Sequence, residues 1–213
     1  MTLAATRDRI AARWREVADA GAGHGRRHPV AAVAAAGFVI VVAVLTRPLA
    51  ATLPLETAAR WGWSADLVRR GDWWRLVTAL PLTRDPFMLA SMVLSLLVAV
   101  GVLERLAGWR RAAVTVTGGA IAGYLGVTAI VLVLRGLGLA AAGSWAQTLD
   151  YGASAGVAAC AGAAAGLLHE RVVTVALATV VAGGLVLHHQ IADWEHAFAF
   201  AAMGPLTRLR ATT

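Results

Sequence analysis

Long apolar blocks, separated by short polar segments, run along most of the chain. The six blocks cover residues 29–46, 86–103, 112–134, 152–168, 172–187 and 192–207. A helix needs about 20 apolar residues to cross a bilayer, and the shorter blocks fit where they are buried among longer helices or where the bilayer thins locally. Pro205 interrupts the last block. The pattern predicts an all-α membrane protein with six transmembrane helices.

The fourth block consists almost only of glycine and alanine. Gly152 and Gly156 form one small-xxx-small pair, and Gly162 and Gly166 form a second. Such pairs let neighbouring backbones come close, whereas a helix with so few large side chains is poorly suited to face lipid. We therefore expect the fourth helix to be short and to lie at the centre of the bundle.

The composition agrees with a membrane protein and argues against a nucleic-acid-binding protein and a disulfide-bonded one. Hydrophobic residues make up 59% of the 213 residues and charged residues 15%, with a mean hydropathy of +0.68. Soluble domains are usually about half apolar and a quarter charged. The net charge is +7 and every basic residue is Arg, but these residues lie between apolar blocks, so we expect no nucleic-acid partner. The single cysteine, Cys160, excludes an internal disulfide.

The distribution of Arg between the loops predicts the orientation. Arg occurs in segments 1–28, 104–111, 169–171 and 208–213, and is absent from 136–151 and 188–191. By the positive-inside rule, the first four segments are cytoplasmic. The loop 47–85 also carries Arg on the predicted outer side, but it is long and has its own apolar and aromatic content, so it counts for less. We expect a multi-pass protein of the inner (plasma) membrane with a cytoplasmic N-terminus.

These boundaries divide the chain into three parts. Residues 1–28 form a basic cytoplasmic segment, residues 29–207 form the membrane domain, and residues 208–213 form a cytoplasmic tail. Apolar residues recur at helical spacing within the first part, which favours a short helix on the anionic inner leaflet. A disordered basic tail is an equally good interpretation of that segment.

Two polar residues inside apolar blocks are candidates for chemistry. Ser154 is the third residue of the fourth block, and His196 lies five residues into the last. Both blocks run from the outside to the inside, so the two side chains are expected at similar depth near the outer surface. A histidine beside a serine can take the hydroxyl proton as acyl transfer begins. Serine alone is common at helix contacts in membranes, whereas an ionisable side chain within a span usually has a role.

A second group of polar residues is expected on the same outer side. It comprises Asp150, His188, His189, Asp193 and Glu195. Histidine and carboxylate side chains suit zinc, but the group lacks a recognised ligand spacing. We interpret it as a solvated rim, and expect no metal and no cofactor.

The loop 47–85 contains the sequence GDWWRLVT over residues 71–78, with Trp74 and Arg75 at its centre. The sequence ERLAG begins at Glu104, and the sequence GASA includes Ser154. Together with His196, these sequences resemble the rhomboid family of intramembrane serine proteases. The first is similar to the Trp-Arg motif of the family's first outer loop, the second to the motif that ends its second helix and the third to its nucleophile motif, and His196 stands where the family has its base.

The resemblance implies a six-helix bundle with a cytoplasmic N-terminus, a short central fourth helix and an outer loop half-submerged in the outer leaflet. It also implies that Ser154 is the nucleophile and His196 the general base, with Gly152 leaving room for tight backbone. The family has Gly directly after the nucleophile, whereas this chain has Ala155. The tyrosine that the family places four residues after the nucleophile is Ala158 here.

The positions that correspond to the family's oxyanion-binding side chains also differ. Counting back from Glu104 places Met92 at the family's Asn and Met88 at its His, and neither methionine is a hydrogen-bond donor. Loss of one oxyanion donor typically slows an enzyme by about two to three orders of magnitude. Ser91 and Ser95 share the face of Met88, so a hydroxyl from either is a candidate replacement.

Three functions follow in order of preference. The first is an intramembrane serine protease that cleaves transmembrane segments of other membrane proteins near the outer leaflet. The second is an inactive pseudoprotease that binds transmembrane helices of client proteins within the bilayer. The third is a small transporter that uses His196 and Glu195 as a proton relay, although the chain has no internal repeat of the kind many transporters show.

Overall fold

The computed structural model describes residues 29–47, 49–168 and 191–210, with the side chains of 191 and 204–210 excepted. It also describes the isolated residues Ala12, Arg15, Val175, Ala178 and Thr179. Nearly all of the predicted fifth helix and of the basic segment 1–28 therefore lies outside the described residues. Every element within the described ranges is a helix. Outside the helices, Trp63 and Asp150 form one isolated antiparallel bridge.

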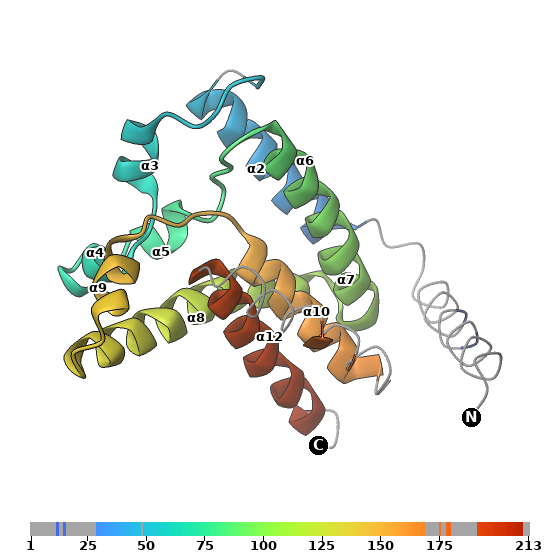
Figure 1. Cartoon of the computed structure of the whole chain (residues 1–213). Coiled ribbons are helices and arrows are strands. Elements are labelled where there is room, and N and C mark those ends of the chain that lie inside the picture. Colours follow the sequence, from blue (N-terminus) through green and yellow to red (C-terminus); the bar gives the residue numbers. More distant parts are fainter. Residues whose placement is uncertain are drawn as a thin grey trace.

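The long helices follow the apolar blocks (Figure 1). They are α2 (Val30–Thr46), α6 (Pro86–Ser95) with the π-helical turn η1 (Leu96–Val100) and α7 (Gly101–Ala107), α8 (Trp109–Gly136), α10 (Ser154–Leu168) and α12 (Ile191–Arg210). The loops carry four shorter helices, which are α3 (Leu55–Trp61), α4 (Ala65–Arg69), α5 (Arg75–Thr78) and α9 (Ala140–Gln147). Helix formation is thus confirmed for five of the six blocks. Pro205 does not end the last helix, because α12 continues through it to Arg210.

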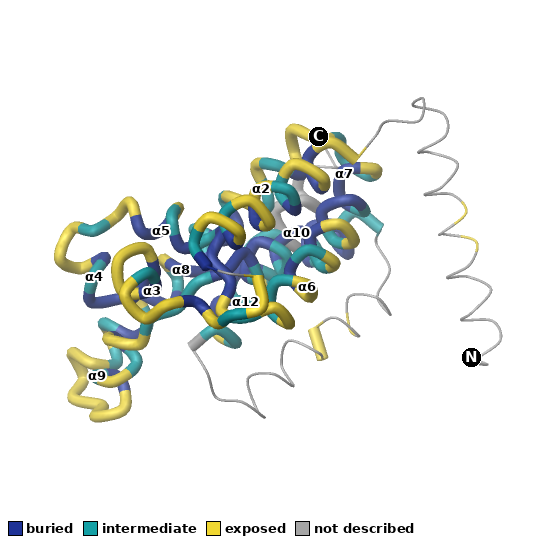
Figure 2. Tube along the Cα trace, turned by 90° about the horizontal axis from the view of Figure 1, so that it is seen from above, coloured by how far each residue is buried: buried dark blue, intermediate teal, exposed yellow. Residues whose placement is uncertain are grey.

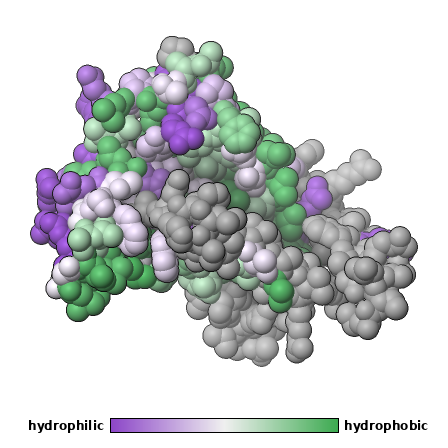
Figure 3. Space-filling model, in the orientation of Figure 1, coloured by the Kyte–Doolittle hydropathy of each residue, from purple (hydrophilic) through white to green (hydrophobic). Residues whose placement is uncertain are grey.

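Two helical stretches are long and apolar enough to cross a membrane. They are Pro86–Ala107, formed by α6, η1 and α7, and Trp109–Gly136, which is α8. Only 28% of the apolar window in the first and 44% in the second are buried, so most residues of each window are at least partly exposed. Exposed apolar surface of this extent is typical of a membrane-facing or partner-facing helix rather than of a soluble core. In Figure 3, apolar residues line the side of α2 and α6, and hydrophilic residues gather around α3 and α4.

Helix α10 lies in the middle of the molecule. Nine of its fifteen residues are buried, and it packs against both α8 and α12 (Figure 2). The backbone of α10 comes so close to these two helices that a residue larger than glycine does not fit at the contacts. A Cβ atom at Gly162 would lie 2.5 Å from the carbonyl oxygen of Phe200, and one at Gly156 would lie 2.2 Å from that of Val116. The small-residue pattern therefore produces a central helix, as predicted from the sequence.

Glu104 of α7 joins two helices, far from α3 in the fold (Figure 1). The side chain is 7% exposed, and its Oε2 atom accepts hydrogen bonds from the N–H groups of Ala31 (3.0 Å) and Ala32 (3.2 Å). The first N–H groups of a helix have no intrahelical partner, and the helix dipole favours a carboxylate there. Glu104 of α7 therefore caps α2 and fixes the two helices to each other.

Arg75 organises the segment that carries α3, α4 and α5. Its guanidinium donates to the carbonyl oxygens of Ala59 (2.8 Å) and Gly62 (2.9 Å) and pairs with Asp72 (3.1 Å). It also lies over the ring of Trp74, 4.6 Å from the ring centroid. These contacts satisfy backbone groups that the irregular segment leaves without helical partners.

Candidate functional site

Ser154 is the first residue of α10, directly after a tight turn at Gly152. Gly152 has a φ of +116°, which favours glycine, and its N–H donates to the carbonyl of Ala79 (2.9 Å). Within the described part of the chain, the backbone N–H groups of Ser154, Ala155 and Gly156 have no acceptor. Free N–H groups at a helix N-terminus attract negative charge. The turn thus places a hydroxyl beside a ready-made set of anion-binding donors.

His196 lies in the second turn of α12, the helix that packs most extensively on α10. Its Nε2 atom is buried and has no hydrogen-bond partner. The two helices meet at Gly123 of α8, where a Cβ atom would lie 3.1 Å from Cβ of Ala155 and 3.0 Å from the carbonyl oxygen of Glu195. The residues next to Ser154 and His196 therefore converge on one point. Among the described residues, Ser154 and His196 form no hydrogen bond with each other.

Two methionines of α6 fill the space beside the turn. A Cβ atom at Gly152 would lie 2.8 Å from Cε of Met88 and 3.3 Å from Cε of Met92. These are the positions where the resemblance implies oxyanion-binding side chains, and here they present thioether methyl groups. The structure does not bring Ser91 to Ser154, because Ser91 is exposed and its hydroxyl donates to the Met88 carbonyl of its own helix (3.0 Å).

The expectation of a solvated polar rim is wrong for Glu195, and Asp150 is half-buried. Glu195 is 1% exposed, and both its Oε1 atom and Oδ2 of Asp150 are buried without a donor. Burial raises the pKa of the Asp150 carboxyl above its ordinary value, and the N–H of Tyr151, which donates to Oδ1 (2.7 Å), opposes the rise. His188 and His189 lie outside the described residues. Within the described ranges, no three His, Cys, Asp or Glu side chains form a metal-binding group.

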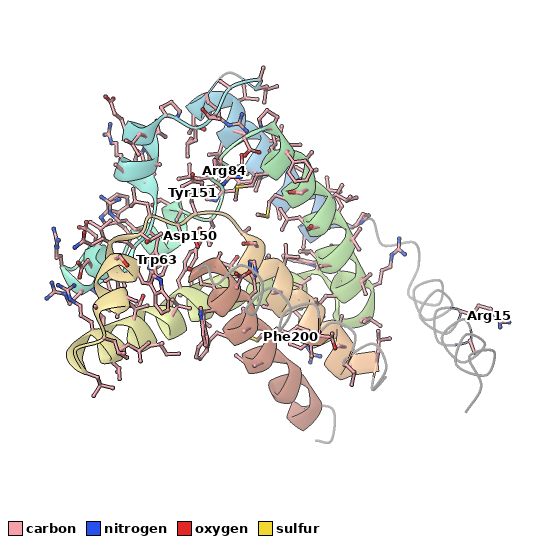
Figure 4. The ribbon with its side chains drawn as sticks, in the orientation of Figure 1. Arg15, Trp63, Arg84, Asp150, Tyr151 and Phe200 are labelled. Carbon is pink, nitrogen blue, oxygen red and sulfur yellow. The ribbon has the colours of Figure 1, made fainter. Side chains whose placement is uncertain are left out.

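Tyr124 and Trp63 support the site and were missed by the sequence analysis. Tyr124 of α8 is fully buried, and its hydroxyl donates to the carbonyl of Gly152 (2.8 Å). Its ring stacks on Trp63, with centroids 4.8 Å apart. Trp63 in turn pairs through its backbone with Asp150. Figure 4 labels the side chains of both residues. A buried tyrosine hydroxyl needs a partner, so a tyrosine within an apolar block was the available signal.

Of the motif residues Trp74 and Arg75, only Arg75 is connected to the site through the backbone in the described part of the chain, and the exposed Trp74 packs its ring on the Arg75 guanidinium. Arg75 fixes α5, and the carbonyl of Ala79 at the end of α5 accepts the N–H of Gly152. Glu104 lies at the end of α7, where it caps α2, and so contributes to the scaffold rather than to the Ser154 surroundings. Comparison of this chain with protein-family models, with curated proteins and with solved structures gives no match.

Proposed function

We propose that this chain is a rhomboid-like membrane protein with six membrane-spanning helices that hydrolyses a peptide bond in a transmembrane segment of another membrane protein. Its N-terminus is cytoplasmic and its active site opens near the outer leaflet of the inner membrane. The observation that carries the proposal is the position of Ser154 at the free N-terminus of α10, beside the helix that holds the half-buried His196, whose Nε2 atom is buried and has no hydrogen-bond partner.

The chemistry follows from these groups. His196 takes the hydroxyl proton of Ser154 as Oγ attacks the carbonyl carbon of the substrate. The oxyanion of the tetrahedral intermediate accepts hydrogen bonds from the free N–H groups at the start of α10. His196 then protonates the departing amine, and a water molecule hydrolyses the acyl ester by the reverse sequence. The methionines beside Gly152 add no donor, so turnover is slow.

A second candidate function rests on those same methionines. Met88 and Met92 pack their methyl groups on Gly152, which is the contact expected of an inactive relative that binds transmembrane helices without cutting them. The pseudoprotease hypothesis predicts a folded protein in which Ser154 does not react.

A serine-directed probe separates the two functions. The full chain in lipid is treated with a fluorophosphonate and, in parallel, with a panel of model transmembrane substrates. If it is a protease, Ser154→Ala and His196→Ala should lower labelling and cleavage by about three orders of magnitude or more. The matched control is Ser144→Ala, which changes an exposed serine of α9 and should leave both unchanged.

A gain-of-function variant sharpens the test. Met92→Asn adds an amide donor beside Gly152 and should raise the labelling rate of an active protease, because a further oxyanion donor becomes available. If neither the wild type nor Met92→Asn reacts with the probe or cuts a substrate while both remain folded, the protease hypothesis is rejected in favour of the pseudoprotease.

A further inference from the structure

Two hydrogen bonds fix the turn that precedes Ser154. The N–H of Gly152 donates to the carbonyl of Ala79 at the end of α5 (2.9 Å), and the carbonyl of Gly152 accepts the hydroxyl of Tyr124 in α8 (2.8 Å). Each bond holds one of the two rigid peptide planes that flank Gly152, and φ and ψ describe how these planes are turned against each other. The φ of +116° at Gly152 is therefore held by two residues that are distant in sequence.

The ring of Tyr124 is itself held in one orientation. It stacks on the ring of Trp63, with the centroids 4.8 Å apart and the planes inclined by 11°. Both residues are completely buried. Trp63 also forms two backbone hydrogen bonds with Asp150 (2.9 and 2.8 Å), which lies two positions before Gly152. A rotation of the phenol away from Gly152 would therefore disturb the same loop at two points.

The bond to Tyr124 decides where the next N–H group points. In a trans peptide, the C=O and N–H groups point in opposite directions. Because the carbonyl of Gly152 points to the Tyr124 hydroxyl, the N–H of Ala153 points away from that hydroxyl. Within the described part of the chain, the N–H of Ala153 has no acceptor, and it adjoins the free N–H groups of Ser154 and Ala155.

We propose that Tyr124 is a positioning residue for the proposed hydrolysis. Its hydroxyl holds the Gly152–Ala153 peptide in the orientation in which the N–H of Ala153 joins the N–H groups at the start of α10 as a donor to the oxyanion. A donor of this kind is effective because its direction is fixed before the reaction. The backbone of the turn thus provides what the thioethers of Met88 and Met92 cannot provide. The donor role rests on the proposed function, whereas the hold of Tyr124 on the turn does not.

Removal of a single oxygen atom tests the hold on the turn. Tyr124→Phe keeps the ring that stacks on Trp63, but the Gly152 carbonyl loses its donor. Amide hydrogen exchange of the full chain in lipid should become about tenfold faster at Gly152, because the turn opens more readily. The matched control is Thr128→Val, which removes a buried hydroxyl that donates within α8 itself (2.7 Å) and should leave the exchange at Gly152 unchanged. Unchanged exchange in Tyr124→Phe, or equal acceleration in both variants, overturns the proposal.

A measurement on the wild type makes the test independent of variants that fail to fold. The chain contains two tyrosines, Tyr124 and Tyr151, so NMR of protein with labelled tyrosine rings reports on two hydroxyl groups. The hydroxyl proton of Tyr124 should exchange slowly with water, because it is buried and donates to Gly152. The half-buried Tyr151 should exchange its hydroxyl proton rapidly, and Tyr151→Phe assigns the signals. Rapid exchange of both hydroxyl protons in the wild type overturns the proposal.

The rate at which a fluorophosphonate labels Ser154 tests the donor role. In Tyr124→Phe, the maximal labelling rate should fall by about ten- to a hundredfold, because one donor is no longer held in place, while the probe concentration that gives half of that rate stays the same. A purely structural loss would instead lower the fraction of labelled protein and leave the rate of the folded fraction unchanged. Thr128→Val should label at the wild-type rate.

The outcomes separate this proposal from the proposed function. A wild-type labelling rate in Tyr124→Phe overturns the donor role and leaves the protease hypothesis standing. If the wild type does not react with the probe at all, the protease hypothesis and the donor role are both rejected. The exchange at Gly152 then still decides whether Tyr124 holds the turn, because that measurement needs no catalysis.

Discussion

The outer segment (α3, α4 and α5) and the central helices (α8, α10 and α12) are held together by different means. In the outer segment, polar side chains bind backbone groups and each other, as Arg75 does with two carbonyls and Arg135 of α8 does with Asp66 of α4 (2.7 Å). In the centre, glycines and alanines let the helix backbones touch. A Cβ atom at Gly119 would lie only 2.1 Å from Cβ of Ala159.

The difference follows from how many backbone hydrogen bonds each segment forms within itself. A long helix satisfies its own N–H and C=O groups, so its contacts depend on shape alone. Short helices and turns leave many of these groups without partners, and a guanidinium with five donors is well suited to bind them. The central helices should therefore be sensitive to added volume, and the outer segment to lost donors.

The largest effect is expected from added volume in the centre. Gly162→Leu would push a side chain into the backbone of α12, where the Phe200 carbonyl cannot move without shifting the helix. We expect a loss of more than about 3 kcal/mol in the free energy of unfolding, or no folded protein. Gly118→Leu is the control, because no atom lies within 4 Å of its Cβ position, and its effect should stay within about 0.5 kcal/mol. Equal melting of both variants would show that α10 is not tightly packed.

A smaller effect is expected from the loss of a donor in the outer segment. The Arg75 side chain is 11% exposed and that of Arg69 is 54% exposed, although both pair with an Asp. Arg75→Ala leaves two carbonyls without their donor and should lower the free energy of unfolding by about 3 kcal/mol. Arg69→Ala should cost less than about 1 kcal/mol. Thermal unfolding in detergent measures both, and equal shifts would argue against a structural role for the Trp-Arg motif.

The smallest effect is expected at the start of α6, where a cap depends on pH. The Met88 N–H, which donates to Asp85 (2.8 Å), lowers the pKa of that carboxyl, and Arg84 adds to the effect. The cap therefore stabilises the fold above the ordinary carboxyl pKa, and the stabilisation is lost as pH falls through the lowered pKa. Asp85→Ala should melt at a slightly lower temperature than the wild type at neutral pH. In acid the two proteins should melt at the same temperature. A difference that persists in acid would show that the charge of Asp85 is not what stabilises α6.

The sequence analysis identified the helices well and the polar contacts less well. Apolar blocks and glycine spacing predicted five helices and the central position of α10, because both depend on local pattern. It was harder to predict the contacts of Asp150, Glu195 and Tyr124, because their partners lie far away in the sequence. Asp150 and Glu195 were placed near water because they lie at the ends of apolar blocks, but Glu195 is buried against α8 and the backbone of Asp150 pairs with Trp63.

The sequence by itself determined which segments become helices and which of them lack side chains large enough to keep neighbours apart. Periodicity and residue size act within one segment, so they are visible without knowledge of the fold. Only the tertiary structure decided that Met88 and Met92 would pack on Gly152, that Ser91 would be exposed, and that Glu195 would be buried. The physical reason is that burial and contact between side chains depend on how separate helices pack, and small rotations of a helix change which residues face the site.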